Sequence, residues 1–164
     1  MRTLLMIILM AGLATPALAQ KFGHIDSQAL LESMPERDSL QTVLQNQATM
    51  YDTELTNMQT EFQTKYQSYL EAGATLPQAI RTQRETELRT MEQGMQDAAT
   101  TFQTELGRLE QELFTPMIER AKTAIEKVGE VNGFTYIFDV SAGATLYNGG
   151  EDIMPLVKAE LGIK

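Results

Sequence analysis

The feature of this 164-residue sequence that most restricts its fold is residues 36–70, because they include only helix-compatible residues and lack glycine and proline. Apolar side chains recur here at alternating steps of four and three residues, which predicts one face of a long α-helix. The stripe consists of Leu44, Ala48, Tyr51, Leu55, Met58, Phe62 and Tyr69, with Lys65 as a polar break. A helix of roughly 35 residues is about 50 Å long, so it cannot bury its stripe within a compact domain of this size.

A second long helix is predicted from about Gln78 to Val131. Much of its apolar stripe fits an 11-residue repeat, in two tracks: Met91, Phe102, Leu113 and Ala124, and Met95, Leu106, Met117 and Val128. Such a repeat disfavours the left-handed supercoil of a regular coiled coil. Pro116 lacks a backbone donor and predicts a kink near Glu112, and Gly94 and Gly107 weaken the helix further.

The turn between these helices is predicted at residues 71–77, where Gly73 can take the left-handed conformation that ends a helix. Thr75 and Gln78 have the spacing of a capping box for the second helix, as Ser33 and Glu36 have for the first. A short connection between two long helices predicts an antiparallel hairpin. We call this hairpin, residues 36–131, the arm.

The arm is rich in glutamine, threonine and glutamate, with methionine among its apolar residues. One interpretation is a solvated coiled-coil surface around a seam that contains methionine. The other is that part of the methionine and aromatic surface contacts changing partners, because methionine is flexible and polarizable. Both interpretations can hold on different faces of one arm.

The two ends of the mature chain predict a small β base, residues 20–35 and 132–164. Strands are expected at Lys21–Asp26, at Phe134–Asp139 and at Ala144–Tyr147. Short helices are expected at 27–33, capped by Asp26 or Ser27, and at 153–161, opened by Glu151 and Asp152. The fold class is therefore α+β and mostly helical. Three short strands make a small core, so we expect the base to need other copies of itself.

The first residues, 1–19, have the pattern of a cleavable signal peptide: Arg2, an apolar run from Leu4 to Leu13, and the small-residue site Ala17–Ala19. The alternative is a membrane anchor, but the run is shorter than the roughly 20 residues that span a bilayer. The prediction is a single mature domain over residues 20–164 in a bacterial periplasm, with no integral anchor after cleavage.

Charge and composition restrict the function. The formal net charge is −9, so nucleic acid is a poor partner, because contacts from Lys and Arg to phosphates dominate such binding. The sequence has no cysteine and a single histidine, His24. No nucleophile, phosphate-loop or metal-ligand pattern is present, so no catalytic residue, metal or cofactor is predicted. Asp26 and Asp139 both end strands, and each is expected to cap the helix or turn that comes next in the chain.

The order of several segments resembles the periplasmic chaperones of the Skp or OmpH-like family. The matching pieces are the opening strand at 21–26, the descending-helix segments at 116–119 and 124–128, the turn and strand at 132–139, and the tail residues Leu146, Tyr147, Asp152 and Ile153. The resemblance covers the mature chain, in which the arm matches in layout rather than in residues.

The resemblance implies a homotrimer whose subunits pool short strands in a central barrel. Three arms enclose a cavity that holds unfolded outer-membrane proteins, without ATP. The residues expected to contact such client proteins are Tyr51, Met58, Phe62, Tyr69, Arg81, Arg84, Met91 and Met95. Those expected in the trimer base are Phe22, Ile25, Phe134, Tyr136, Ile137, Phe138 and Leu146.

This chain departs from the best-known relatives, which are basic. Arg81, Arg84 and Arg89, with Lys65 on the opposing helix, form either a local positive patch or an ordinary solvated face. The alternative function is a structural coiled-coil spacer or adaptor of the cell envelope with one fixed partner.

Overall fold

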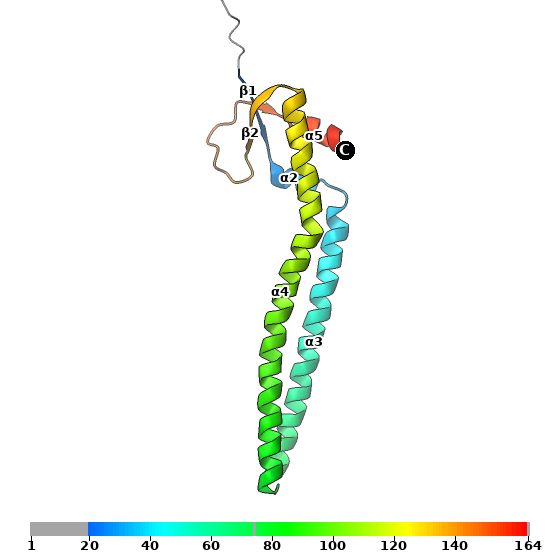
Figure 1. Ribbon diagram of the computed structural model, residues 1–164, viewed down its shortest axis with the longest axis vertical. Helices are drawn as coiled ribbons and strands as arrows, with labels where there is room; N and C mark the ends of the chain where they lie inside the picture. Colours follow the sequence, from blue (N-terminus) through cyan, green and yellow to red (C-terminus); the bar gives the residue numbers. More distant parts are fainter. Residues whose placement is uncertain (1–19, 74, 164) are drawn as a thin grey trace, which may run out of the picture. The chain divides into compact units, whose positions relative to one another are not determined.

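The computed structural model describes residues 20–73 and 75–163. The predicted signal peptide, residues 1–19, lies outside this part of the chain. The elements are β1 (Lys21–Ile25), α2 (Ser27–Glu32), α3 (Arg37–Ala72), α4 (Gln78–Val131), β2 (Phe134–Asp139), β3 (Glu151–Asp152) and α5 (Met154–Leu161) (Figure 1). The chain is mostly helical with one small sheet, which confirms the predicted α+β class. It divides into two compact units, residues 20–30 with 123–162 and residues 31–122. None of the described helices is long and apolar enough to cross a membrane.

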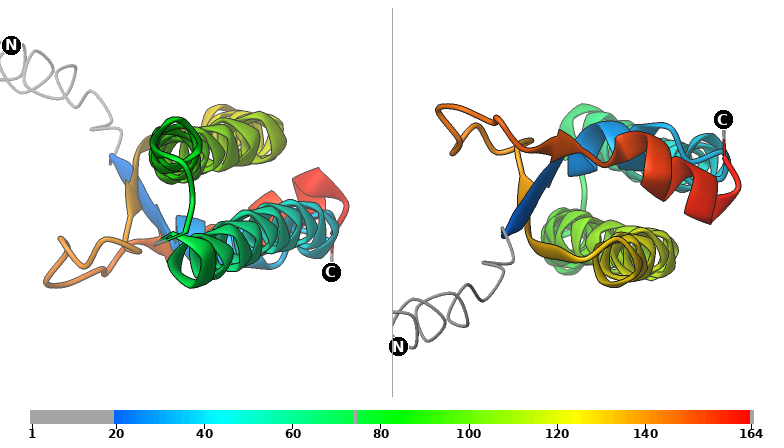
Figure 2. Two further views of the ribbon diagram at one scale, coloured as in Figure 1. Left: turned by 90° about the horizontal axis from the view of Figure 1, so that it is seen from below. Right: turned by 90° about the horizontal axis from the view of Figure 1, so that it is seen from above.

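Residues 31–122 form one unit, in which the long helices make the antiparallel hairpin that was predicted over residues 36–131, and the end of α4 from residue 123 belongs to the other unit. Helices α3 and α4 run side by side, as Figures 1 and 2 both show, and α4 continues through Pro116 as one helix. The hairpin has little interior: none of the residues of α3 is buried, and the buried apolar side chains of this unit are Met34, Met117 and Ala121. The long helices are thus held together by a half-exposed seam.

The predicted caps of the long helices are wrong in detail. Gly73 ends α3 with φ −56°, in the right-handed region rather than the left-handed one. The Thr75 hydroxyl donates to the Ala72 carbonyl at 2.8 Å, as the Thr75 amide does at 2.9 Å, so this side chain closes the turn instead of capping α4.

The first long helix begins later than the capping box at Ser33 and Glu36 predicts, at Arg37. Glu36 precedes α3 with helical backbone angles and makes no side-chain cap bond. Its carboxylate pairs instead with Arg120 on α4 at 2.8 Å. The Glu36 side chain thus contacts the other helix of the hairpin and does not cap its own helix.

The sheet belongs to the other unit and has the strand order β2-β1-β3, with both pairings parallel. Strands from the two ends of the chain do share one sheet, as predicted. The prediction of a strand at Ala144–Tyr147 is wrong, because the third strand is Glu151–Asp152, opposite Gly23 and His24.

A short turn explains the shifted third strand. The Asp152 carboxylate accepts a hydrogen bond from the Met154 amide at 2.9 Å, so Glu151 and Asp152 precede the last helix and do not open it. The helix runs from Met154 to Leu161 and is followed by Gly162, whose φ of 70° is the left-handed conformation that caps a helix C-terminus.

One face of this sheet packs on helices. The buried side chains of the unit are Ile25, Leu30, Ala124, Val128, Ile153 and Val157. Gly23 is buried in the middle of β1, where an added Cβ would lie 3.0 Å from the side chains of Ile153 and Phe134. Only a residue without a side chain lets these two approach the strand so closely.

Candidate interaction surfaces

The seam of the arm holds most of the residues predicted to contact clients. Tyr51 and Phe102 stack across the hairpin, with ring centroids 4.3 Å apart and planes 3° from parallel. The half-buried members of the predicted set are Tyr51, Met58, Phe62, Tyr69, Arg81, Met91 and Met95, while Arg84 is exposed. The half-buried residues are thus partly covered within the arm and still present part of their surface to solvent.

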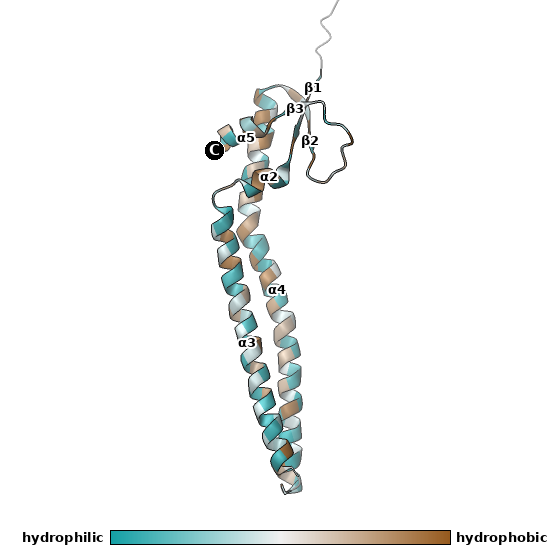
Figure 3. Cartoon of the chain, turned by 180° about the vertical axis from the view of Figure 1, so that it is seen from behind, coloured by the Kyte–Doolittle hydropathy of each residue, from teal (hydrophilic) through white to brown (hydrophobic). Residues whose placement is uncertain are grey.

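Further apolar side chains project from the arm outside the seam. Exposed large side chains in this unit are Val43, Met50, Tyr66, Leu70, Ile80 and Ile118. Figure 3 shows short hydrophobic stretches between hydrophilic ones along both long helices. These residues were not predicted as contact residues, because they lie outside the apolar stripes from which the long helices were predicted. Apolar residues that break the regular spacing of these stripes are the sequence signal that indicates them.

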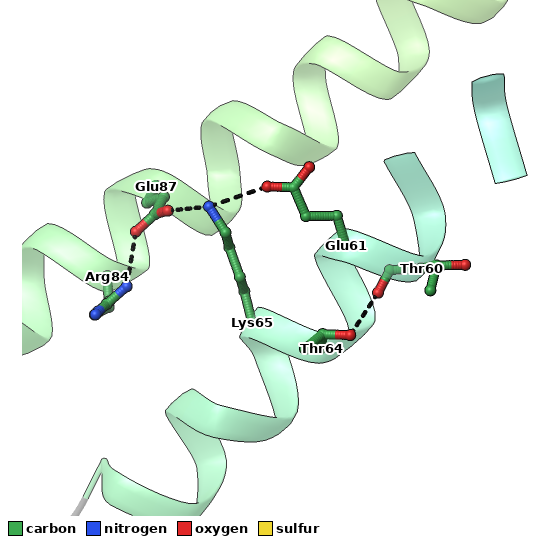
Figure 4. Close-up of polar contacts among 6 residues, drawn as sticks. All are labelled: Thr60, Glu61, Thr64, Lys65, Arg84 and Glu87. Atoms are coloured by element: carbon green, nitrogen blue, oxygen red, sulfur yellow. Dashed lines mark hydrogen bonds and ion pairs between the residues drawn. The ribbon is translucent and has the colours of Figure 1, made fainter. Parts of the chain in front are cut away.

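Charged residues near the tip of the arm pair with one another (Figure 4). The Lys65 ammonium lies 2.5 Å from a Glu87 carboxylate oxygen on α4 and 3.2 Å from one of Glu61. Arg84 pairs with the other oxygen of Glu87 at 3.2 Å. The hydrogen bond between Lys65 and Glu87 raises the pKa of the lysine and lowers that of the carboxyl. Two of the four cations of the suggested positive patch are therefore matched by carboxylates.

A second polar contact joins the helices beside this cluster. The Tyr69 hydroxyl donates to Glu85 at 2.6 Å, and this bond raises the pKa of the phenol. Of the client residues predicted near the tip, Tyr69 and Arg84 thus already have partners within the arm.

The base presents aromatic side chains on the sheet face opposite its core. The rings of Phe22, Tyr136 and Phe138 lie 6.1–6.3 Å apart, and all three are exposed. Beside them is a hollow of about 680 Å³, which the loop between β2 and β3 helps to line. In this loop the side chains of Leu146 and Tyr147 are almost fully exposed.

The other predicted base residues face inward. Ile25 is buried, and the Ile137 side chain lies 3.0 Å from where a Cβ on Gly129 of α4 would be. The Lys21 ammonium lies 3.9 Å above the Phe134 ring. Six of the seven predicted base residues thus divide between a helix-covered face and an uncovered aromatic face, and the seventh, Leu146, lies in the exposed loop between β2 and β3.

A carboxylate joins the two ends of the chain within the base. Asp139 accepts hydrogen bonds from the Ser27 hydroxyl at 2.5 Å, from the Ser27 amide at 3.2 Å and from the Ser141 amide at 3.0 Å. Burial raises the pKa of Asp139, but these bonds outweigh it and lower the pKa to about 2. Asp26 caps α2 through the Ala29 amide at 2.9 Å. The predicted capping roles of both aspartates are confirmed.

The described residues include no group of three or more His, Asp or Glu side chains arranged to hold a metal ion. The Nδ1 atom of His24 is buried without a hydrogen-bond partner in this part of the chain.

Comparison with known proteins assigns the family. The model of the family described as outer membrane protein (OmpH-like) matches residues 21–161. The chain belongs to the OmpH-like family. Among curated relatives, the chaperone protein Skp of Pectobacterium atrosepticum is 22% identical over 154 residues, which cover 92% of this chain and 93% of that protein. The chaperone protein Skp of Yersinia enterocolitica is 25% identical over 126 residues, 77% of each chain.

A solved structure shares the fold of this OmpH-like protein. The crystal structure of an OmpH-like protein from Caulobacter crescentus superimposes with a TM-score of 0.73 and 21% identity, covering 90% of this chain and 86% of that one. The family is a chaperone family, and the resemblance seen in the sequence is confirmed.

Proposed function

We propose that this OmpH-like protein is an ATP-independent holdase chaperone of the periplasm. It binds unfolded outer-membrane proteins between its arms and prevents their aggregation. Strands of an unfolded barrel protein aggregate readily in water, because their edges and their lipid-facing side chains have no partners there. A holdase has only to cover these groups, bind weakly at many points and let go.

The observation that carries this proposal is the arm itself. A hairpin of two helices, 36 and 54 residues long, leaves its apolar seam half-exposed and adds exposed side chains such as Met50 and Leu70. These groups are scattered among Gln, Thr and Glu rather than gathered in one patch. Such a surface suits weak contacts with many different chains, and several arms acting together raise the overall affinity.

The uncovered aromatic face of the base supports the trimer that this function requires. Phe22, Tyr136 and Phe138 are exposed on a sheet of only three strands. Apolar side chains gathered and exposed on one face in this way mark a protein–protein interaction surface. Three copies that pool their sheets would cover these rings and bring three arms together around one cavity.

Aggregation of a real client tests the proposal. A urea-unfolded outer-membrane barrel protein is diluted into buffer with the mature chain, and light scattering is followed. We expect scattering to fall to background near one trimer per client. Unchanged scattering in the presence of folded chaperone would refute the holdase function. A single stoichiometric envelope partner without any effect on unfolded clients would favour the spacer or adaptor instead.

A further inference from the structure

A groove runs between the two helices of the arm, in the halves of the helices away from the tip. It has a volume of about 360 Å³ and is lined by Gln41, Leu44, Gln45 and Ala48 of α3 and by Gln103, Leu106, Gly107 and Glu110 of α4. This volume falls within the range of small-ligand pockets, which starts at about 300 Å³. We call it the Gly107 groove, because an added Cβ at Gly107 would meet nothing within 4 Å.

The lining combines an apolar floor with a polar rim. Leu44, Ala48 and Leu106 are half-buried, whereas the three glutamines and Glu110 are exposed. Glutamine offers a carbonyl oxygen that accepts hydrogen bonds from a cation as readily as from a neutral donor. The groove can therefore accept a side chain that is apolar along its length and polar at its end.

The charge of the groove decides which side chain fits. Glu110 makes no ion pair with any described residue, because the nearest cation along the helix, Arg108, is shared between Glu105 and Glu112. The groove thus carries one free negative charge and no positive one. An acidic side chain would be repelled, and a purely apolar one would remove water from Glu110 without giving it a partner.

We propose that the Gly107 groove binds a lysine or arginine side chain of an unfolded client segment. The methylene stem of such a residue lies against Leu44 and Leu106, as these amphipathic side chains commonly do on apolar surface. Its cationic end pairs with Glu110, and glutamine oxygens accept its remaining hydrogens. This inference rests on the proposed holdase function and specifies the client chemistry. The arm prefers cationic client segments, whereas a basic arm would attract acidic ones.

Two synthetic peptides test the preference. They share one alternating apolar sequence and differ only at a central position, which is lysine in one and the neutral isostere norleucine in the other. The lysine peptide is expected to bind the mature protein about two- to fivefold more tightly, as one exposed ion pair allows. It is also expected to shift the amide NMR signal of Gly107. Equal affinities for both peptides would overturn the proposal.

Variants locate the preference in the groove. Glu110→Gln keeps the shape and removes the charge, so the ratio of the two affinities is expected to fall to about one. Gly107→Met fills the groove with an unbranched side chain and is expected to do the same. The matched control is Gly94→Met, on the same helix, where an added Cβ also meets nothing within 4 Å. Its ratio should stay at the wild-type value.

The outcomes separate this inference from the holdase function. A preference that survives Glu110→Gln, or that Gly94→Met removes as fully as Gly107→Met does, would contradict the groove. If Gly107→Met fails to fold, the result for Glu110→Gln decides. Unchanged suppression of client aggregation with no lysine preference would leave the holdase function standing and reject the groove. A lysine preference without suppression of client aggregation would reject the holdase function and leave the groove standing.

Discussion

At the scale of single residues, Asp139 accepts hydrogen bonds from both ends of the sequence that forms the base. It ties Ser27 at the start of α2 to Ser141, which lies 114 positions further along the chain. The sequence places both Asp26 and Asp139 at strand ends and so predicts caps. It does not predict that Asp139 would bond to the opposite end of the chain, because that contact depends on the parallel register of β1 and β2.

Replacing Asp139 with asparagine should destabilise the base. Hydrogen bonds to a charged acceptor contribute more than neutral ones, and partial exposure reduces the loss to about 1 kcal/mol at neutral pH. The pKa of Asp139 is lowered from 3.8 to about 2, so its contribution is complete above pH 4–5 and is lost as pH falls towards 2. The free-energy gap between wild type and Asp139→Asn should therefore shrink over this window.

Urea unfolding followed by circular dichroism at neutral and acidic pH measures this gap. Glu126→Gln is the control, since Glu126 is an exposed carboxylate of the same unit. A gap of equal size at pH 7 and pH 2.5 would show that the Asp139 carboxylate does not act through its charge.

A methyl group at Gly23 should also destabilise the base. The new Cβ would lie 3.0 Å from Ile153 and from Phe134, and overpacking of this kind costs about 1–3 kcal/mol. Gly94→Ala is the opposite case, because the added atom meets nothing and helix propensity improves by about 0.5–1 kcal/mol. Equal stability of the two variants in urea would contradict this account of β1.

At the scale of elements, the long helices could be predicted because periodicity over many residues is a strong signal. The residues that pair between the two helices could not be predicted. Lys65 interrupts the apolar stripe of α3, and the structure explains the interruption through Glu87, which faces it across the seam. Such a partner depends on the register of two helices, and no local spacing in the sequence fixes that register.

For the third strand, local strand propensity predicted the wrong segment. Ala144–Tyr147 has better strand residues than Glu151–Asp152, yet the structure pairs Glu151 and Asp152 with β1. The free edge of β1 and the turn before α5 decide the pairing. Strand propensity is weak beside such tertiary context, especially over two residues.

The stack of Tyr51 on Phe102 is the contact to test within the arm. Truncating either ring to alanine should lower the stability of the hairpin, and a double-mutant cycle should give a coupling of about 0.5–1.5 kcal/mol, the usual range for stacked aromatic pairs. Val43→Ala is the control, because Val43 is exposed outside the seam. A coupling near zero would mean that the two rings stabilise the arm independently.

At the scale of the whole molecule, the sequence predicted the family and the mostly helical α+β fold, but not how the charged side chains pair. A formal net charge of −9 and the pairing of Lys65 and Arg84 with Glu87 leave little positive field to attract an acidic client. We infer that apolar contacts and free carboxylates such as Glu110 carry the binding. Higher salt should then weaken binding of cationic peptides, since screening acts on exposed charges.

The mass of the complex with one unfolded client tests the central claim most directly. The mature chain is mixed with a urea-unfolded outer-membrane barrel protein, diluted from urea, and passed over a sizing column with multi-angle light scattering. We expect a single soluble species with the mass of three subunits and one client. A folded monomer that elutes apart from an aggregated client would contradict both the trimer and the holdase function.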